Sequence, residues 1–167
     1  MKIGFVSLGC PKNQLDTEIM LHEVLEAGHE ITPEDIEADV IIVNTCAFIE
    51  DAQAEAIENI LEASKYKEDG NLKALIVTGC LAERFRDDVT EEIHEVDVAV
   101  GIGKNSDIAK IVIDAIEGKR QNYFAEKEAL EGCYETILRH SPALLVSVYH
   151  RSEDLFALPL QIAEKFP

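Results

Sequence analysis

Three apolar runs in this chain each end in a single cysteine that is followed by a helical pattern, and this arrangement limits the possible folds most. The cysteines are Cys10, Cys46 and Cys80, within the stretches SLGCPKN, VNTCAFI and VTGCLA. They follow one another at intervals of about 35 residues, roughly the length of one βαβ unit. Parallel strands end at one common edge of their sheet, where ligands bind in open α/β folds. The sequence therefore predicts three thiols gathered at that edge.

The remaining pattern alternates strand and helix in the same way. Helices are expected after each strand, and Asp16 is expected to cap the first of them, which Gly28 would end. Asn105 or Ser106 is expected to cap the last one. The expected strands are 2–8, 39–44, 72–78 and 96–100, with a further edge strand at 121–124. Such alternation predicts an α/β fold, a doubly wound Rossmann-like or flavodoxin-like parallel sheet of four to five strands.

Apolar periodicity also predicts which residues of the helices face the core. In the first helix the expected inward residues are Ile19, Met20, Val24 and Ala27, and in the helix that starts at Glu50 they are Ala52, Ala56, Ile57, Ile60 and Leu61. After Gly118 the regular alternation stops. We therefore expect a domain over residues 1–130 and a short helix–strand–helix tail over residues 131–167.

Composition restricts the partners and the location. The net charge is −18, from 15 basic and 33 acidic residues, so the surface would repel a phosphate backbone and we expect no direct binding of nucleic acid. This charge suits a basic protein partner, although it could equally serve solubility alone. No apolar run approaches the roughly 20 residues of a membrane helix. We also find no signal-peptide pattern, so we expect a cytoplasmic protein without membrane contact.

The cysteines favour metal chemistry over disulfides. Four cysteines in a cytoplasmic chain argue against a disulfide framework, and the fourth, Cys133, lies outside the three motifs. Thiolates select zinc, copper(I) and iron–sulfur clusters. Zinc sites usually use closely spaced cysteine pairs, which are absent here, whereas ligands from three separate loops suit a larger cluster. The helix N-termini that follow the cysteines are expected to lower the thiol pKa values. The competing interpretation is that each cysteine is a small core residue.

The flanking sequences resemble a known family. The segments SLGCPKNQLDTE, ADVIIVNTCAFIEDAQAEAIENILE and LIVTGCLAERF resemble, in order and spacing, the amino-terminal domain of the radical S-adenosylmethionine methylthiotransferases over roughly residues 1–130. This resemblance implies that Cys10, Cys46 and Cys80 ligate an auxiliary [4Fe–4S] cluster involved in sulfur transfer. The residues after the first two cysteines resemble the branch that modifies an aspartyl residue of a small-subunit ribosomal protein. That branch implies a basic ribosomal protein as partner, and a fragment of a tRNA methylthiotransferase is the alternative.

The chain also departs from that family. The Cys-x₃-Cys-x₂-Cys loop that holds S-adenosylmethionine and a second cluster in such enzymes is missing, and so is their terminal β-barrel domain. We therefore expect the chain alone to be inactive and to need the radical S-adenosylmethionine domain of a full enzyme. Residues 131–167 resemble instead the carboxy-terminal end of FkbM-type methyltransferases. A truncated or fused gene with a junction near residues 125–132 would explain this tail.

Two asparagines are candidate cofactor-binding residues. Asn13 and Asn44 lie next to the cysteine loops and could donate hydrogen bonds to cluster sulfurs, which would tune the potential of the cluster. Turn geometry or helix capping is the competing role of these residues. Gly9 and Gly79 are expected to let the backbone approach a bulky ligand. No catalytic residue is predicted, and a flavodoxin-like binding or interaction domain with core cysteines is the second functional hypothesis.

Overall fold

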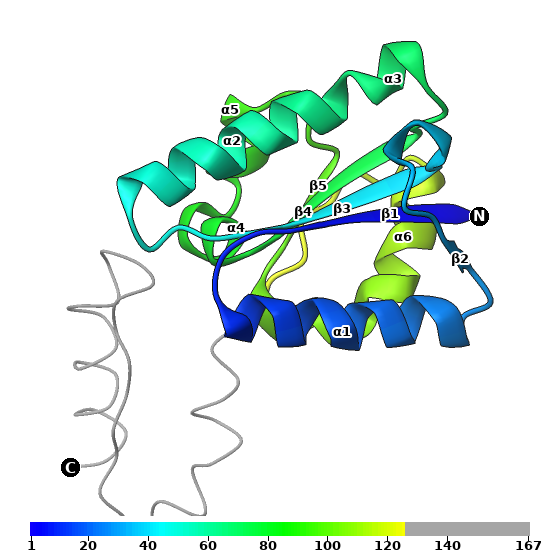
Figure 1. Cartoon of the computed structure of the whole chain (residues 1–167), viewed down its shortest axis with the longest axis horizontal. Helices are drawn as coiled ribbons and strands as arrows, with labels where there is room; N and C mark the ends of the chain where they lie inside the picture. The colour runs from blue at the N-terminus through cyan, green and yellow to red at the C-terminus, as the bar shows by residue number, and fades with distance from the viewer. Residues whose placement is uncertain (126–167) are drawn as a thin grey trace, which may run out of the picture. The chain divides into compact units, whose positions relative to one another are not determined.

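A five-stranded, all-parallel sheet forms the centre of the described part of the chain, which in this computed structural model is residues 1–125 (Figure 1). The strands lie in the order β2-β1-β3-β4-β5, the flavodoxin-like order of a doubly wound sheet. Their bounds are β1 Lys2–Ser7, β2 Glu30–Ile31, β3 Val40–Thr45, β4 Ala74–Gly79 and β5 Val98–Val100. The predicted fold class is confirmed.

The central strands are apolar along their whole length because both faces of the sheet are covered. All six residues of β3 and all six of β4 are buried. On one face lie α2 (Glu50–Ser64), α3 (Tyr66–Asp69), α4 (Cys80–Phe85) and α5 (Asp88–Glu92), and on the other lie α1 (Pro11–Glu26) and α6 (Ile108–Ile116) (Figure 1). Two short 3₁₀ turns, Asp35–Glu37 and Ile102–Asp107, complete the connections. A continuous run of β-branched residues is what this two-sided burial requires.

Residues Met1–Phe124 form one compact unit. The predicted tail over 131–167, its resemblance to FkbM-type enzymes and the fourth cysteine, Cys133, lie outside the described residues. Within residues 1–125, no helix has the length and apolar character needed to cross a bilayer.

The first helix differs from its prediction. α1 begins at Pro11 with Cys10 at the N-cap position, because proline is well suited to the first turn of a helix. Asp16, the predicted cap, lies inside α1, where its carboxylate is 2.9 Å from the Lys12 ammonium. The buried face of α1 carries Asn13, Thr17, Met20 and Val24, whereas the predicted inward residues Ile19 and Ala27 are exposed.

Further local predictions also need correction. Strand β2 was not predicted because two residues carry no periodic signal. Ile57 and Leu61 of α2, both predicted to face the core, are 40% and 43% exposed. Asn105 does not cap α6 but is buried, where its Oδ1 accepts a hydrogen bond of 2.9 Å from the Thr78 hydroxyl. The edge strand predicted at 121–124 is reduced to one parallel bridge between Val100 and Tyr123.

Candidate metal centre

The carboxyl ends of three neighbouring strands lead into the three cysteine loops at one edge of the sheet. The strand register aligns Ser7 with Asn44 and Asn44 with Thr78, so β1, β3 and β4 end at the same level. Cys10 and Cys46 follow the first two of these ends, and Cys80 is the first residue of α4, directly after the third. The parallel topology therefore brings together cysteines that are far apart in the sequence.

The side-chain amide of Asn13 lies at the centre of this arrangement and is only 1% exposed. Its Nδ2 donates hydrogen bonds of 2.9 Å to the carbonyl oxygens of Leu8 and Thr45. Two carbonyls can be satisfied only by the NH₂ group, so the amide oxygen must point the other way. There Oδ1 lies 4.0 Å from the Cys10 Sγ and 3.9 Å from the Cys80 Sγ, both of which can donate weakly to it. These two thiols thus flank a single oxygen atom.

The third thiol approaches the same amide from the Gly9 side. A Cβ added to Gly9 would lie 2.8 Å from the Cys46 Cβ, 3.4 Å from its Sγ and 3.1 Å from the Asn13 Nδ2. Gly9 also has φ of +97°, a conformation that side chains disfavour. The close approach of this loop to Cys46 therefore requires glycine, and it places all three cysteines around Asn13.

The cysteines differ in their access to solvent. Cys10 is exposed, Cys46 and Cys80 are partly buried, and all three are free thiols. Cys80 also packs against the hydrophobic core on the α2 face of the sheet. The exposure of Cys10 is contrary to the hypothesis of core cysteines, which would be expected to lack solvent access.

Asn44 is a fully buried residue of β3 that bonds to the first turns of α1. Its Nδ2 donates to the Asn13 carbonyl oxygen at 2.8 Å and to the Thr17 hydroxyl at 3.0 Å. Its Oδ1 has no hydrogen-bond partner within residues 1–125. The amide N–H groups of Asn13 and Asn44 are thus used to hold the protein together. Their predicted role in binding a cofactor stays a prediction.

The close approach of β3 and β4 depends on Gly79. This residue has φ of +94° and ψ of −162°, a region that is essentially restricted to glycine. A Cβ at this position would lie 2.3 Å from the Thr45 carbonyl oxygen and 2.4 Å from the Asn44 Oδ1. Glycine here lets the loop before Cys80 pass directly against the end of β3.

The electrostatic environment differs between the thiols. The backbone N–H groups of Asn13 and Lys12, at the start of α1, lower the pKa of the Cys10 thiol. Burial raises the pKa of the Cys80 thiol, and the neighbouring Cys46 adds to this effect. The predicted lowering is therefore confirmed for Cys10 and wrong for Cys80, because desolvation outweighs the helix N-terminus there.

The donor set consists of thiols, which are the ligands that iron–sulfur clusters use. Within residues 1–125, the His, Cys, Asp and Glu side chains form no group of three or more that could hold a metal ion. A mononuclear site draws its ligands around bonds of about 2.3 Å, whereas the ligands of a cluster bind separate corners and stay further apart. Three convergent free thiols are the type of ligand that such a cluster uses.

Two residues that the sequence analysis missed hold the Cys46 loop in place. The carbonyl oxygen of Ala47 accepts hydrogen bonds from the Gln53 Nε2 at 3.2 Å and the Arg84 Nη1 at 3.1 Å. Arg84 lies four residues after Cys80, on α4, and so links that helix to the loop. The sequence shows that Arg84 lies one helical turn after Cys80. It does not show that the Arg84 side chain donates to a backbone oxygen of another loop.

Comparison with known proteins gives the family. Residues 2–101 match the model of a family described as "Uncharacterized protein family UPF0004". The chain belongs to this family. The UPF0004 match includes all three cysteine loops, and it confirms the resemblance to the amino-terminal domain of methylthiotransferases.

The curated relatives of this chain are named as methylthiotransferases. The chain is 46% identical over 130 residues to the ribosomal protein uS12 methylthiotransferase RimO of Lachnoclostridium phytofermentans, covering 78% of the chain and 30% of that protein. It is 48% identical over 143 residues to the protein of the same name from Desulforamulus reducens, covering 86% of the chain and 31% of that protein. The chain thus spans about 30% of the length of the curated relatives that it matches.

Proposed function

We propose that this chain is the auxiliary [4Fe–4S] cluster-binding domain of a methylthiotransferase, with Cys10, Cys46 and Cys80 as the cluster ligands. The observation that carries this proposal is the convergence of three free thiols, from three successive strand ends, on the amide of Asn13. Three protein thiolates would leave one iron of such a cluster without a protein ligand, where an exogenous sulfur could bind. Asn13 and Asn44 would orient the first cysteine loop, and Gln53 and Arg84 the second.

The acceptor that we propose is an aspartyl residue of the small-subunit ribosomal protein uS12. The names of the relatives give uS12 as their target, and the basic character of a ribosomal protein would complement the net charge of −18. This reaction would take place in the cytoplasm and would require the S-adenosylmethionine-binding radical domain of a longer enzyme. The tRNA-modifying alternative is disfavoured because these relatives, at 46% and 48% identity, carry the ribosomal name.

Anaerobic reconstitution with iron and sulfide tests the ligand assignment. We expect a brown protein with about four irons per chain, and we expect serine at Cys10, Cys46 or Cys80 to remove most of the iron. Cys133→Ser is the matched control because it also deletes one thiol, and it should retain the iron. A colourless wild-type product, or an equal loss in the Cys133 variant, would reject the assignment.

A domain exchange tests the acceptor. Residues 1–125 of this chain would replace the matching segment of the Desulforamulus reducens relative, and the modification of uS12 would be followed by mass spectrometry. We expect the chimera to modify uS12 and to lose this ability when Cys46 is changed to serine. A chimera that holds its full iron content yet modifies tRNA instead would favour the alternative.

A further inference from the structure

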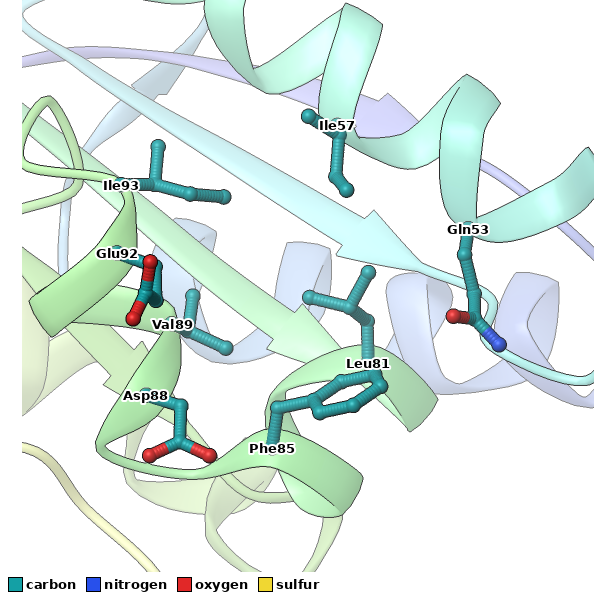
Figure 2. A pocket seen from close by; sticks show the side chains of 8 residues that line it. All are labelled: Gln53, Ile57, Leu81, Phe85, Asp88, Val89, Glu92 and Ile93. Atoms are coloured by element: carbon teal, nitrogen blue, oxygen red, sulfur yellow. The ribbon is translucent and has the colours of Figure 1, made fainter. Parts of the chain in front are cut away.

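An apolar pocket lies beside the cysteine loops, between α2 and the two short helices α4 and α5. Its volume is about 190 Å³, enough for one large apolar side chain, given that an engineered cavity of about 150 Å³ holds benzene. Figure 2 shows Ile57 of α2 facing Leu81 and Phe85 of α4 across it. The remaining lining residues are Gln53, Asp88, Val89, Glu92 and Ile93.

The rim of the pocket exposes apolar side chains that ordinary amphipathic packing would cover. Ile57 is 40% exposed and Phe85 is 36% exposed. A second hollow along α2 shares Ile57 and adds Leu61, which is 43% exposed. The apolar surface therefore continues from the pocket along the helix, and contiguous exposed apolar surface often marks an interaction site.

Two of the three helices that line the pocket, α2 and α5, are acidic, whereas α4 carries Arg84, whose guanidinium lies 5.4 Å from the centre of the Phe85 ring. Helices α2 and α5 carry no lysine or arginine, and within residues 1–125 none of their carboxylates forms an ion pair, although nine ion pairs occur elsewhere in this part of the chain. These carboxylates belong to Glu50, Asp51, Glu55, Glu58, Glu62, Asp88, Glu91 and Glu92. An apolar pocket between unpaired carboxylates is complementary to an apolar side chain flanked by lysine or arginine.

We propose that this pocket docks a basic polypeptide segment, which inserts one large apolar side chain between Ile57 and Phe85 while its cationic neighbours contact the carboxylates of α2 and α5. The inference rests on the proposed function in taking the ribosomal-protein acceptor as the source of that segment. The pocket adjoins the candidate metal centre, since Leu81 follows Cys80 directly and Gln53 bonds the carbonyl oxygen of Ala47, beside Cys46. Docking at this position would hold a basic protein next to the thiols.

Binding of purified uS12 to the iron-free full chain tests the proposal by titration calorimetry at low salt. We expect Phe85→Ala to weaken the affinity by about tenfold, as for a central interface anchor. The double variant Asp88→Asn/Glu92→Gln should weaken it several-fold and flatten its dependence on salt. The matched control is Leu25→Ala/Glu26→Gln on α1, on the opposite face of the sheet, which should bind as the wild type does. Urea unfolding of each variant verifies that the fold is retained.

Several outcomes would overturn the proposal. These are the absence of binding by the wild-type chain, unchanged binding by the pocket variants, and an equal loss in the α1 control. Sedimentation that shows a dimer dissociated by Phe85→Ala would assign the pocket to a second copy. Carbodiimide cross-links from α2 or α5 to lysines of residues 126–167 would assign it to the chain itself. Binding is measured without iron, so the two proposals can fail separately. Failed cluster loading with intact uS12 binding rejects only the cluster assignment. Normal cluster loading without uS12 binding rejects only the docking proposal.

Discussion

Cys10 and Cys80 are expected to differ in reactivity because their local environments differ. Cys10 is exposed at the N-cap of α1, and backbone N–H groups lower its pKa. Cys80 is partly buried and its pKa is raised. The thiolate is both the nucleophile and the metal ligand. The pKa of each thiol therefore determines which cysteine reacts first at a given pH.

Alkylation by iodoacetamide should therefore modify Cys10 before Cys80 at neutral pH. A lowered pKa leaves more thiolate at a given pH, so the rate at Cys10 should level off at lower pH, whereas the rate at Cys80 should keep rising into the alkaline range. Peptide mass spectrometry over a series of pH values measures both rates in the folded chain. The same series in urea is the control, where the two profiles should converge. Equal profiles in the folded chain would contradict the expectation.

Asn13→Asp should destabilise the chain by about 3 kcal/mol, because it buries a carboxylate against two carbonyl oxygens that have lost their donor. The added negative charge should also slow alkylation of Cys10 and Cys80 by raising their pKa values. Urea unfolding and the alkylation assay measure the two effects. Asn59→Asp makes the same change at a partly exposed site on α2, away from the cysteines, and should have little effect on either measurement. Similar stability of the two variants would refute the role given to Asn13.

At the scale of the secondary-structure elements, tight loops set the geometry of the site. Strands β3 and β4 are paired in register up to Thr45 and Gly79, and the backbone of Gly79 passes against the Thr45 carbonyl. No side chain can occupy that space, so the loop before Cys80 depends on the absence of a Cβ.

Gly79→Ala should cost about 4 kcal/mol or more, from backbone strain of about 1–3 kcal/mol plus a clash with fixed backbone atoms. Gly28→Ala is the matched control, because Gly28 also has a positive φ, of +81°, but nothing lies within 4 Å of the added Cβ. It should cost only about 1–2 kcal/mol. Urea unfolding measures the difference. Equal costs would show that the close approach at Gly79 contributes nothing.

The central strands were predictable from the sequence, whereas the buried faces of α1 and α2 were predicted only in part. The strands β3 and β4 were placed within two residues, because buried parallel strands give long β-branched runs. The inward face of α1 was misjudged because Asn13 and Thr17 occupy it in place of Ile19. Apolar periodicity cannot reveal a polar network that is satisfied inside the protein.

The candidate site was likewise predictable from the sequence only in part. The topology predicted that Cys10, Cys46 and Cys80 would meet, because parallel strands end at one edge. The central position of Asn13, with its oxygen between two sulfurs, depends on two backbone carbonyls. The opposite pKa shifts of Cys10 and Cys80 depend on burial, which spacing does not reveal.

At the scale of the whole molecule, the net charge of −18 opposes compaction. Self-repulsion among carboxylates is long-ranged, whereas most ion pairs of the described residues, such as that of Lys73 with Asp39 at 2.7 Å, include a partly buried group. Salt screens partly buried pairs less than it screens exposed charges. Repulsion should therefore outweigh pairing in the response of this protein to salt.

Raising sodium chloride from about 0.01 M to 0.1 M, which shortens the screening length from about 30 Å to 10 Å, should stabilise the chain. The urea midpoint should rise, since screening weakens the repulsion more than it weakens the ion pairs. The triple variant Glu55→Gln/Glu58→Gln/Glu62→Gln on α2 should have a higher urea midpoint than the wild type at low salt. Its urea midpoint should also rise less when sodium chloride is added. A midpoint that falls with added salt would contradict this expectation.

The hydrogen bonds around Asn13 join backbone groups of two strand ends, and each of them is made by the polypeptide itself. In small zinc domains, by contrast, metal binding supplies the free energy of folding, and chelators unfold the protein. Under the proposed ligand assignment, chelation of iron would therefore bleach the protein while its circular dichroism stayed constant, and the centre would be loaded after folding instead of driving it.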